Sequence, residues 1–302
     1  MQKQTQTPSN QHQPVLLDAV VSYLDPQPGD RYLDLTAGYG GHATAILART
    51  GFSTGHVLID RDLQAIDYLK QQFLNSEKLQ IIHSDFETAL QTFESKFDLV
   101  LADLGVSSPQ LDNLDRGFSF NKEAELDMRM DRTQHKTATD FVNTLSERDL
   151  ADLIYQYGEE RQSRRIARAI VQQRPIHTTK ELASVVARSY KGNSRIHPAT
   201  RTFQALRIAV NDELGQLERS LPMIESILAP GGRVGIISFH SLEDRIVKQF
   251  IRQSSLEPLH KSVVQEEYNQ VSNPRARSAK LRAAIKNKKG HPGSDKSESV
   301  QK

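Results

Sequence analysis

The segment Asp34-Leu-Thr-Ala-Gly-Tyr-Gly-Gly-His42 decides the fold of this chain of 302 residues. It continues an apolar run, Arg31–Leu35, that predicts a strand, and it leads into a stretch to about Arg49 that predicts a helix. A glycine-rich turn between a strand and a helix is typical of α/β proteins that bind a nucleotide-like ligand at one end of a parallel sheet. We therefore expect the chain to open with such a unit.

Strand-like and helix-like segments continue to alternate after this turn, which is the pattern of a parallel sheet flanked by helices. The expected strands are 31–35, 56–60, 79–83, 97–103 and 233–239, and the expected helices include 62–74, a short one after Phe86, and 242–252. The run Phe97–Asp103 is almost continuously apolar, as in a strand buried on both faces. The pattern predicts an α/β fold with a mostly parallel sheet and helices on both faces.

The alternation stops between about residues 111 and 200, where only helical spacing is found, for example at Leu150, Leu153 and Ile154. The entry to this region, 112–139, is polar and irregular and predicts a mobile loop. One long helix is expected from Pro198 to the Pro-Gly-Gly of residues 230–232. We therefore expect a discontinuous α/β domain, 1–110 and 205–302, and an all-helical insert, 111–204, that recognises the substrate.

Composition limits the function classes. The chain has no cysteine, which excludes disulfides, iron–sulfur clusters and thiolate zinc sites and is compatible with a cytoplasmic location. Neither a signal peptide nor an apolar run long enough to span a bilayer is readable, so no membrane partner is expected. Net charge is only +2, yet residues 274–289 are strongly basic and contain no acid. Such a block indicates either a solvated tail or contact with a polyanion.

The glycine turn alone does not identify the cofactor. Gly38, Gly40 and Ala43 fit the loose dinucleotide pattern, and Asp60 follows at about the expected 20 residues, so a nicotinamide enzyme is one interpretation. A simple glycine-rich turn with a helix-capping aspartate is another. Phe86, placed to pack on an adenine, and Asp103, at the end of the fourth strand near the reacting end of a cofactor, favour a methyltransferase.

Eight longer segments make the match specific, and through them the chain closely resembles the RsmH (MraW) family of bacterial methyltransferases. The resembling segments are His12–Leu17, Asp34–His42, Asp103–Gln110, Arg116–Phe120, Leu126–Asp131, His197–Arg207, Ser238–Arg245 and Asn273–Arg282, in family order across nearly the whole chain. The family acts on N4 of a cytidine in the decoding region of 16S ribosomal RNA.

The resemblance implies a Rossmann-like domain that binds S-adenosylmethionine and is interrupted by a helical domain. The cofactor contacts it implies are Gly40, Gly41, His42, Asp60, Phe86, Asp103 and Gln110. The chain departs from the family at Ala43, where many members have Ser, at Asp18, a frequent Glu, and in a shortened stretch between Arg252 and Asn273.

The catalytic candidate is Asp103. Amino-methyltransferases generally carry Asp/Asn-Pro-Pro-aromatic at this strand end, whereas this chain has Asp103-Leu-Gly-Val106. An aromatic that stacks on the target base must then come from elsewhere, and Phe118 or Phe120 is the candidate, although both fit equally well as local core residues. His42 is better explained as a cofactor contact and His240 as a structural residue than either as a general base. No spacing typical of a metal site is found.

Several basic residues are candidates for contacts with RNA, and the alternative is that they are simply solvated. They are Arg201, Arg207, Arg275, Arg277, Lys280 and Arg282, while Arg161, Arg164, Arg165 and Arg168 share one helix face that could equally be solvated. Besides the ribosomal RNA methyltransferase, two hypotheses remain: a methyltransferase for DNA or a small molecule, and a non-catalytic RNA-binding protein. The expected partner is 16S ribosomal RNA within the small subunit, and the sequence leaves a homodimer open.

Overall fold

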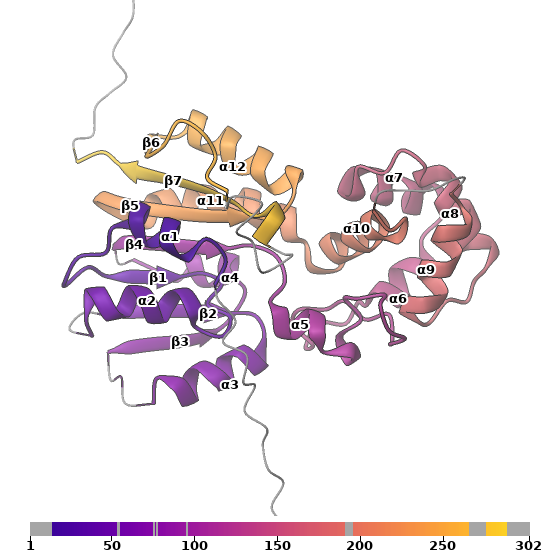
Figure 1. The fold of residues 1–302 in the computed structure, drawn as a ribbon, viewed down its shortest axis with the longest axis horizontal. Helices are drawn as coiled ribbons and strands as arrows, with labels where there is room; N and C mark the ends of the chain where they lie inside the picture. The colour runs from indigo at the N-terminus through magenta and orange to yellow at the C-terminus, as the bar shows by residue number, and fades with distance from the viewer. Residues whose placement is uncertain are drawn as a thin grey trace, which may run out of the picture.

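A sheet of seven strands forms one of two lobes in the computed structural model, which describes residues 14–52, 55–74, 76, 78–94, 96–190, 196–265 and 276–288 (Figure 1). The strands are β1 (Tyr32–Asp34), β2 (His56–Asp60), β3 (Leu79–His83), β4 (Phe97–Asp103), β5 (Leu228–Ser238), β6 (Leu256–Pro258) and β7 (Lys280–Lys286). Their order is β3-β2-β1-β4-β5-β7-β6, with β1 to β5 parallel and β7 antiparallel to both of its neighbours. The α/β fold predicted from the sequence is confirmed.

Helices cover both faces of this sheet. One face carries α1 (Leu17–Leu24), α2 (Gly41–Thr50) and α3 (Leu63–Gln72), and the other carries α4 (Phe86–Leu90), α11 (Glu213–Ile227) and α12 (Ser241–Gln253). The strand order reverses between β1 and β4, so their carboxyl ends flank the crevice at which open α/β sheets bind ligands. The glycine turn after β1 lies at that crevice.

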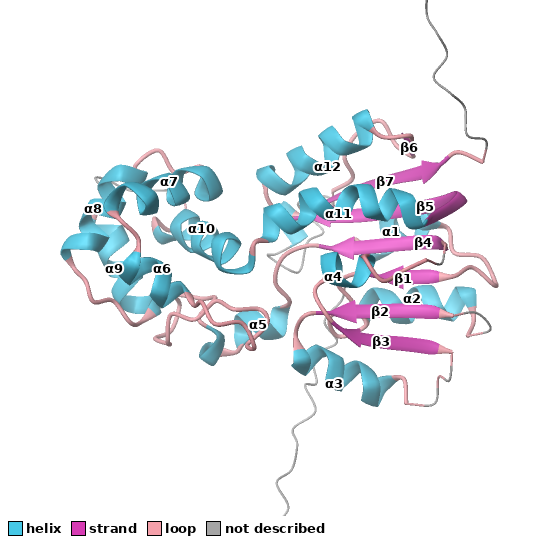
Figure 2. Cartoon of the chain, turned by 180° about the vertical axis from the view of Figure 1, so that it is seen from behind, coloured by secondary structure: helices cyan, strands magenta, loops and turns pink. Residues whose placement is uncertain are grey.

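The second lobe is all-helical (Figure 2). It contains α6 (Ala138–Thr144), α7 (Glu147–Gly158), α8 (Ser163–Gln172), α9 (Thr179–Arg188) and α10 (Ala199–Asn211), and the short α5 (Ser108–Asp112) and the 3₁₀ turn Leu114–Arg116 lead into it. Its hydrophobic core runs from Phe118 to Val210 and is separate from the two cores of the sheet lobe, of which one resumes at Leu217. The domain limit expected at residue 205 therefore falls inside α10, whose Leu206 and Val210 pack in the helical core.

The single long helix expected from Pro198 onward is wrong. The helix is interrupted at Asp212, which adopts the left-handed conformation with φ 48° and ψ 40°. Helix α10 ends before this residue and α11 begins after it. The apolar residues keep helical spacing across Asp212 because α10 and α11 each have one buried apolar face. The stripe of α10 packs in the helical lobe, whereas that of α11 packs against the sheet. Periodicity alone could not reveal that the stripe meets two different cores.

The basic segment near the C-terminus is also different from expectation. Residues 280–286 are not a solvated tail but strand β7, which pairs with β5 from Arg233↔Ile285 to Ser238↔Lys280. Buried Leu281 and Ala283 alternate there with basic residues, and the charges masked this alternation in the sequence. The Pro-Gly-Gly of residues 230–232 lies within the irregular start of β5, after α11 has ended at Ile227.

The entry segment predicted to be a mobile loop is packed. Leu126 and Met128 are fully buried, and the backbone of Met128 donates a hydrogen bond to the carbonyl of Arg116 at 3.0 Å. Gly117 turns the chain there with φ +68°, and an added Cβ would lie 2.4 Å from the carbonyl oxygen of Glu125. Among the described residues, no helix is both long and apolar enough to cross a membrane.

We predict that Gly117→Ala destabilises the protein by about 2 kcal/mol or more, because the substitution combines an unfavourable φ with a backbone clash. Urea unfolding followed by circular dichroism measures the change. Gly29→Ala is the matched control, since Gly29 has φ +91° but nothing within 4 Å of the added Cβ. Equal losses of unfolding free energy for the two variants would show that the packing around Gly117 is looser than described.

Candidate functional site

The glycine turn after β1 is held by the end of β2. The backbone amide of Ala37 donates to the carbonyl of Ile59 at 2.8 Å, and that of Gly38 donates to Oδ2 of Asp60 at 2.7 Å. Gly40 has φ +77°, and a Cβ there would lie 3.0 Å from side-chain atoms of Leu69 and Gln72 on α3. Packing against α3, in addition to any ligand, thus explains why glycine is needed at this position.

Three carboxylates end adjacent parallel strands. Asp34 ends β1, Asp60 ends β2 and Asp103 ends β4. Asp34 is in register with Leu58 and Leu101, each two residues before the other two aspartates, so all three side chains lie on the same face of the sheet. Among the described residues, none of the three has a Lys or Arg nitrogen within 4.0 Å. The edge is therefore acidic and lacks a paired cation.

Burial makes these acids hard to ionise. It raises the pKa of Asp34 to about 7, although the Tyr32 hydroxyl donates to Oδ2 at 2.6 Å and the Thr36 amide to Oδ1 at 3.1 Å. Burial also raises the pKa of Asp60, whose Oδ1 accepts from the amide of Asp62 at 2.8 Å. Both oxygens of Asp60 therefore already accept a backbone amide, and they keep additional lone pairs for a hydroxyl donor.

Asp103 is the least satisfied of the three. Its Oδ1 is buried and has no hydrogen-bond partner in the structure, while its side chain as a whole is 26% exposed. Burial, followed by the charges of Asp34 and Glu243, raises the pKa of Asp103 well above its usual range. Its backbone amide donates to Oγ1 of Thr36 at 2.6 Å, which fixes the strand end beside the glycine turn. A buried acceptor without a donor is costly, so this atom calls for a ligand donor.

His42 is the nearest side chain to Asp103 that could pair with it, but it is neutral. Burial lowers the pKa of His42 to about 4, and its Nε2 donates to the carbonyl of Val15 at 2.9 Å. Its unprotonated Nδ1 lies 3.8 Å from Oδ2 of Asp103, so the contact is not an ion pair near neutral pH. His42 therefore leaves Asp103 without a positive partner, and its predicted contact with the cofactor stays a prediction.

Phe86 and Gln110 lie at the same edge with different surroundings. Phe86 begins α4 and is partly buried against the core of the sheet lobe. Asp85 before it caps that helix, accepting from the amide and the hydroxyl of Thr88 at 2.9 and 2.8 Å. Gln110 is buried, accepts from the amide of Ser107 at 2.9 Å, and donates to Oδ2 of Asp62 at 2.8 Å. Its amide therefore acts within the protein.

A buried ion pair that the sequence analysis did not assign joins the two lobes. Arg116 is 1% exposed and donates from Nη1 to Oδ2 of Asp62 at 2.8 Å and from Nη2 to the carbonyl of Met130 at 2.7 Å. The other carboxylate oxygen of Asp62 caps α3 by accepting from the amide of Gln64 at 3.0 Å. The pair thus anchors the entry to the helical lobe directly beside Asp60. The motif Arg116–Phe120 was visible, but its partner lies 54 residues earlier.

A second, partly buried polar cluster lies where the lobes meet near Asp103. Arg207 of α10 donates two hydrogen bonds of 2.8 Å to the carboxylate of Glu213 on α11. Glu213, His240 and Glu243 bring one possible metal ligand each within 4.8 Å of one another. However, Arg207 already engages both oxygens of Glu213, and the Nδ1 of His240 accepts from the amide of Glu243 at 3.4 Å as a helix cap. The cluster is therefore better explained as a structural joint.

The predicted RNA contacts fall in several places. Phe118 is 8% exposed and belongs to the helical core, whereas Phe120 is partly buried and stacks on His197 with ring centres 4.5 Å apart.

Among the basic candidates, Arg201 is exposed and donates to the carbonyl of Glu159 at 3.1 Å. Lys280 and Arg282 both pair with Asp244, at 3.6 and 2.7 Å. Arg277 is exposed, and Arg275 lies outside the described residues. The RNA roles stay predictions.

The sequence comparisons identify one family. Residues 9–287 match the model of the MraW methylase family. A Synechocystis protein named ribosomal RNA small subunit methyltransferase H is 50% identical over 294 residues, 94% of this chain and 96% of its own. A Deinococcus radiodurans protein of the same name is 50% identical over 285 residues, 91% of this chain and 89% of its own. A solved rRNA methylase from Streptococcus thermophilus is 13% identical, with a TM-score of 0.43, covering 90% of this chain and 93% of that one.

We predict that Arg116→Leu lowers the free energy of unfolding by about 3–5 kcal/mol, because it leaves the buried Asp62 carboxylate without its cation. Urea unfolding with two optical probes measures the change. Arg148→Leu is the control, since Arg148 is 90% exposed and lies 3.9 Å from Asp152. If Arg116→Leu lowered the free energy of unfolding no more than the control does, the buried pair would not have the predicted effect on stability.

Proposed function

The chain belongs to the MraW methylase family, and we infer that it transfers a methyl group from S-adenosylmethionine to N4 of a cytidine in small-subunit ribosomal RNA. We place that cytidine in the decoding region of 16S ribosomal RNA, as the resemblance of the motifs implies. The observation that carries the chemical assignment is the buried, unpartnered Oδ1 of Asp103 at the carboxyl end of β4.

The negative charge and the hydrogen-bond acceptors of the site suit this cofactor. S-adenosylmethionine carries a positive sulfonium, which supplies an electrophilic methyl group, and its methionine part carries an ammonium. The acidic edge formed by Asp34, Asp60 and Asp103 lacks a paired cation, so a cationic ligand relieves its unfavourable charge. Asp60 would hold the ribose hydroxyls and Phe86 would pack on the adenine. Gly40, Gly41 and His42 would line the turn, and Gln110 would support it through Asp62.

We propose that Asp103 is also the residue that orients the target amine. The amine of cytosine is a poor nucleophile because its lone pair is delocalised into the ring. A carboxylate that accepts an N–H hydrogen bond favours a tetrahedral nitrogen and stabilises the positive charge that develops on it. The rest of the catalysis is positioning, since methyl transfer is an in-line displacement. The hydrogen bond from the backbone amide of Asp103 to Oγ1 of Thr36 holds the strand end that carries this side chain.

The base and its RNA must be held by the helical lobe and the sheet edge. Phe120 is the better stacking candidate, because Phe118 is buried in the helical core and Phe120 is less enclosed. Arg201 and Arg277 are exposed, so phosphates can reach their side chains. Arg207, Lys280 and Arg282 pair with carboxylates of the protein, so any contact of theirs with RNA would compete with those pairs.

We predict that Asp103→Asn keeps the fold and lowers kcat on the order of 10²-fold at saturating S-adenosylmethionine and small subunits, the size typical of losing one electrostatic contact to a transition state. Single-turnover methylation of unmodified subunits measures it. Asn preserves the size of the side chain and one acceptor but removes the charge.

The alternative is that Asp103 only holds the cofactor's ammonium. In that case Asp103→Asn would raise the KM for S-adenosylmethionine, and saturating cofactor would restore the rate, which would refute the catalytic role. A pH series adds a control. Because burial raises the pKa of Asp103, acid removes its charge, and wild-type affinity for the cofactor should fall as the pH falls. Asp103→Asn should show a smaller pH dependence.

A further inference from the structure

Helix α8 presents a face of arginines that the proposed reaction does not use. The four arginines are Arg161, in the turn before the helix, and Arg164, Arg165 and Arg168 on it, and all are exposed. At about 100° of rotation per residue, the three arginines on the helix itself fall within an arc of about 100°. Ile166 and Ile170 point to the opposite side and are fully buried in the helical core. The orientation of the face is therefore fixed by packing.

These arginines are largely without acidic partners. Within the described ranges, only Arg168 has a carboxylate within 4.0 Å, that of Glu147 at 3.4 Å, and both side chains of this pair are well exposed. A helix face that is merely solvated usually carries charges of both signs, which pair along it. The outward face of α8 is cationic throughout its first turns instead.

The arginines at the start of α8 do not stabilise the helix itself. Cations near a helix N-terminus oppose the helix dipole. Two other helices of the lobe have a Ser or Thr cap and an acid in the first turn, α7 with Ser146 and α9 with Thr178, whereas α10 has neither. Helix α8 begins after Gln162, which makes no capping bond, and has no acid in its first turn. The arginines therefore need an explanation outside the helix.

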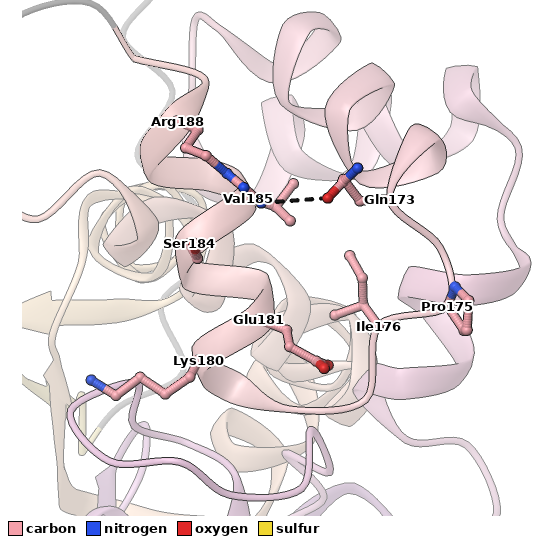
Figure 3. Close-up of a pocket in the computed structure, with 8 residues that line it drawn as sticks. All are labelled: Gln173, Pro175, Ile176, Lys180, Glu181, Ser184, Val185 and Arg188. Carbon is pink, nitrogen blue, oxygen red and sulfur yellow. Dashed lines mark hydrogen bonds between the residues drawn. The ribbon is translucent and has the colours of Figure 1, made fainter.

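The face lies at the outer end of the molecule. Both ribbon views place α8 and α9 at the end of the helical lobe, away from the sheet (Figures 1 and 2). Where α8 ends, a hollow of about 390 Å³ is lined by Gln173 and Arg188, and Arg188 donates a hydrogen bond to Oε1 of Gln173 at 3.5 Å (Figure 3). Glu181 also lines it, but this carboxylate accepts the amides of His177 and Thr178 at 2.8 and 2.9 Å. Arg188 is exposed beside this hollow.

We propose that this face of α8 binds backbone phosphates of the ribosomal RNA, and so holds the RNA while its target base enters the crevice at Asp103. This rests on the proposed function for the identity of the RNA. Charge complementarity selects the partner, because nucleic acid backbones offer a regular row of negative charges and bind arginine with geometric specificity. A small-molecule substrate at Asp103 could not also reach the outer end of the helical lobe, whereas a large folded RNA can.

The test removes three unpaired charges with Arg161→Gln/Arg164→Gln/Arg165→Gln in the full chain, since Gln keeps the helix propensity of Arg. Binding to small subunits that lack the modification is measured over a range of salt concentrations, and binding to a 16S ribosomal RNA transcript is measured in parallel. We expect affinity near 0.1 M salt to drop about 10-fold or more and the salt slope to fall by about 2 to 3, from three lost phosphate contacts. Affinity for S-adenosylmethionine and kcat at saturating subunits should not change.

The matched control is Arg49→Gln/Lys70→Gln/Lys248→Gln, which removes the same charge from exposed residues of the sheet lobe. An equal salt slope for the two triple variants would overturn the proposal, as would weaker binding to subunits with unchanged binding to the transcript, which would assign the face to a ribosomal protein. Wild-type enzyme must form N4-methylcytidine in the same subunits. If it does not, the proposed function fails, while the difference in salt slope still decides whether α8 contacts RNA.

Discussion

The acidic edge of the sheet is the constraint on which the rest of the structure depends. Asp34, Asp60 and Asp103 end neighbouring strands on one face, burial opposes their ionisation, and no Lys or Arg among the described residues pairs with them. An arrangement of this kind is unfavourable for folding alone. It becomes favourable when a cationic ligand occupies the edge, and a sulfonium cofactor with an ammonium group has the required charge.

The two lobes meet at this edge through buried charged groups rather than through a continuous apolar interface. The Arg116–Asp62 pair joins the entry of the helical lobe to the end of β2, and Arg207–Glu213 spans the break between α10 and α11. Both pairs lie at the junction and depend on close geometry, because a buried charge that loses its partner is costly. The helical lobe is thereby held in a fixed place over the crevice, with the α8 face at its outer end (Figure 1).

Much of this could be predicted from the sequence, and the exceptions have physical causes. The parallel strands were visible because apolar runs such as Phe97–Asp103 are bounded by turns. Strand β7 was missed because its polar positions are basic, and the break at Asp212 was missed because two separate cores continue one apolar stripe. The acidic residues of the site stood at predictable strand ends, but the Asp62–Arg116 pair joins residues far apart in the chain, which no local pattern encodes.

The most direct measurement of the central claim is to map the methyl group itself. Unmodified small subunits are incubated with the purified protein and methyl-labelled S-adenosylmethionine, and the RNA is then digested and its nucleosides identified. The account predicts label in N4-methylcytidine at one position in the decoding region of 16S ribosomal RNA. Label on a ring carbon, on another base or in no ribosomal RNA would contradict the assignment of the acidic edge to amine methylation.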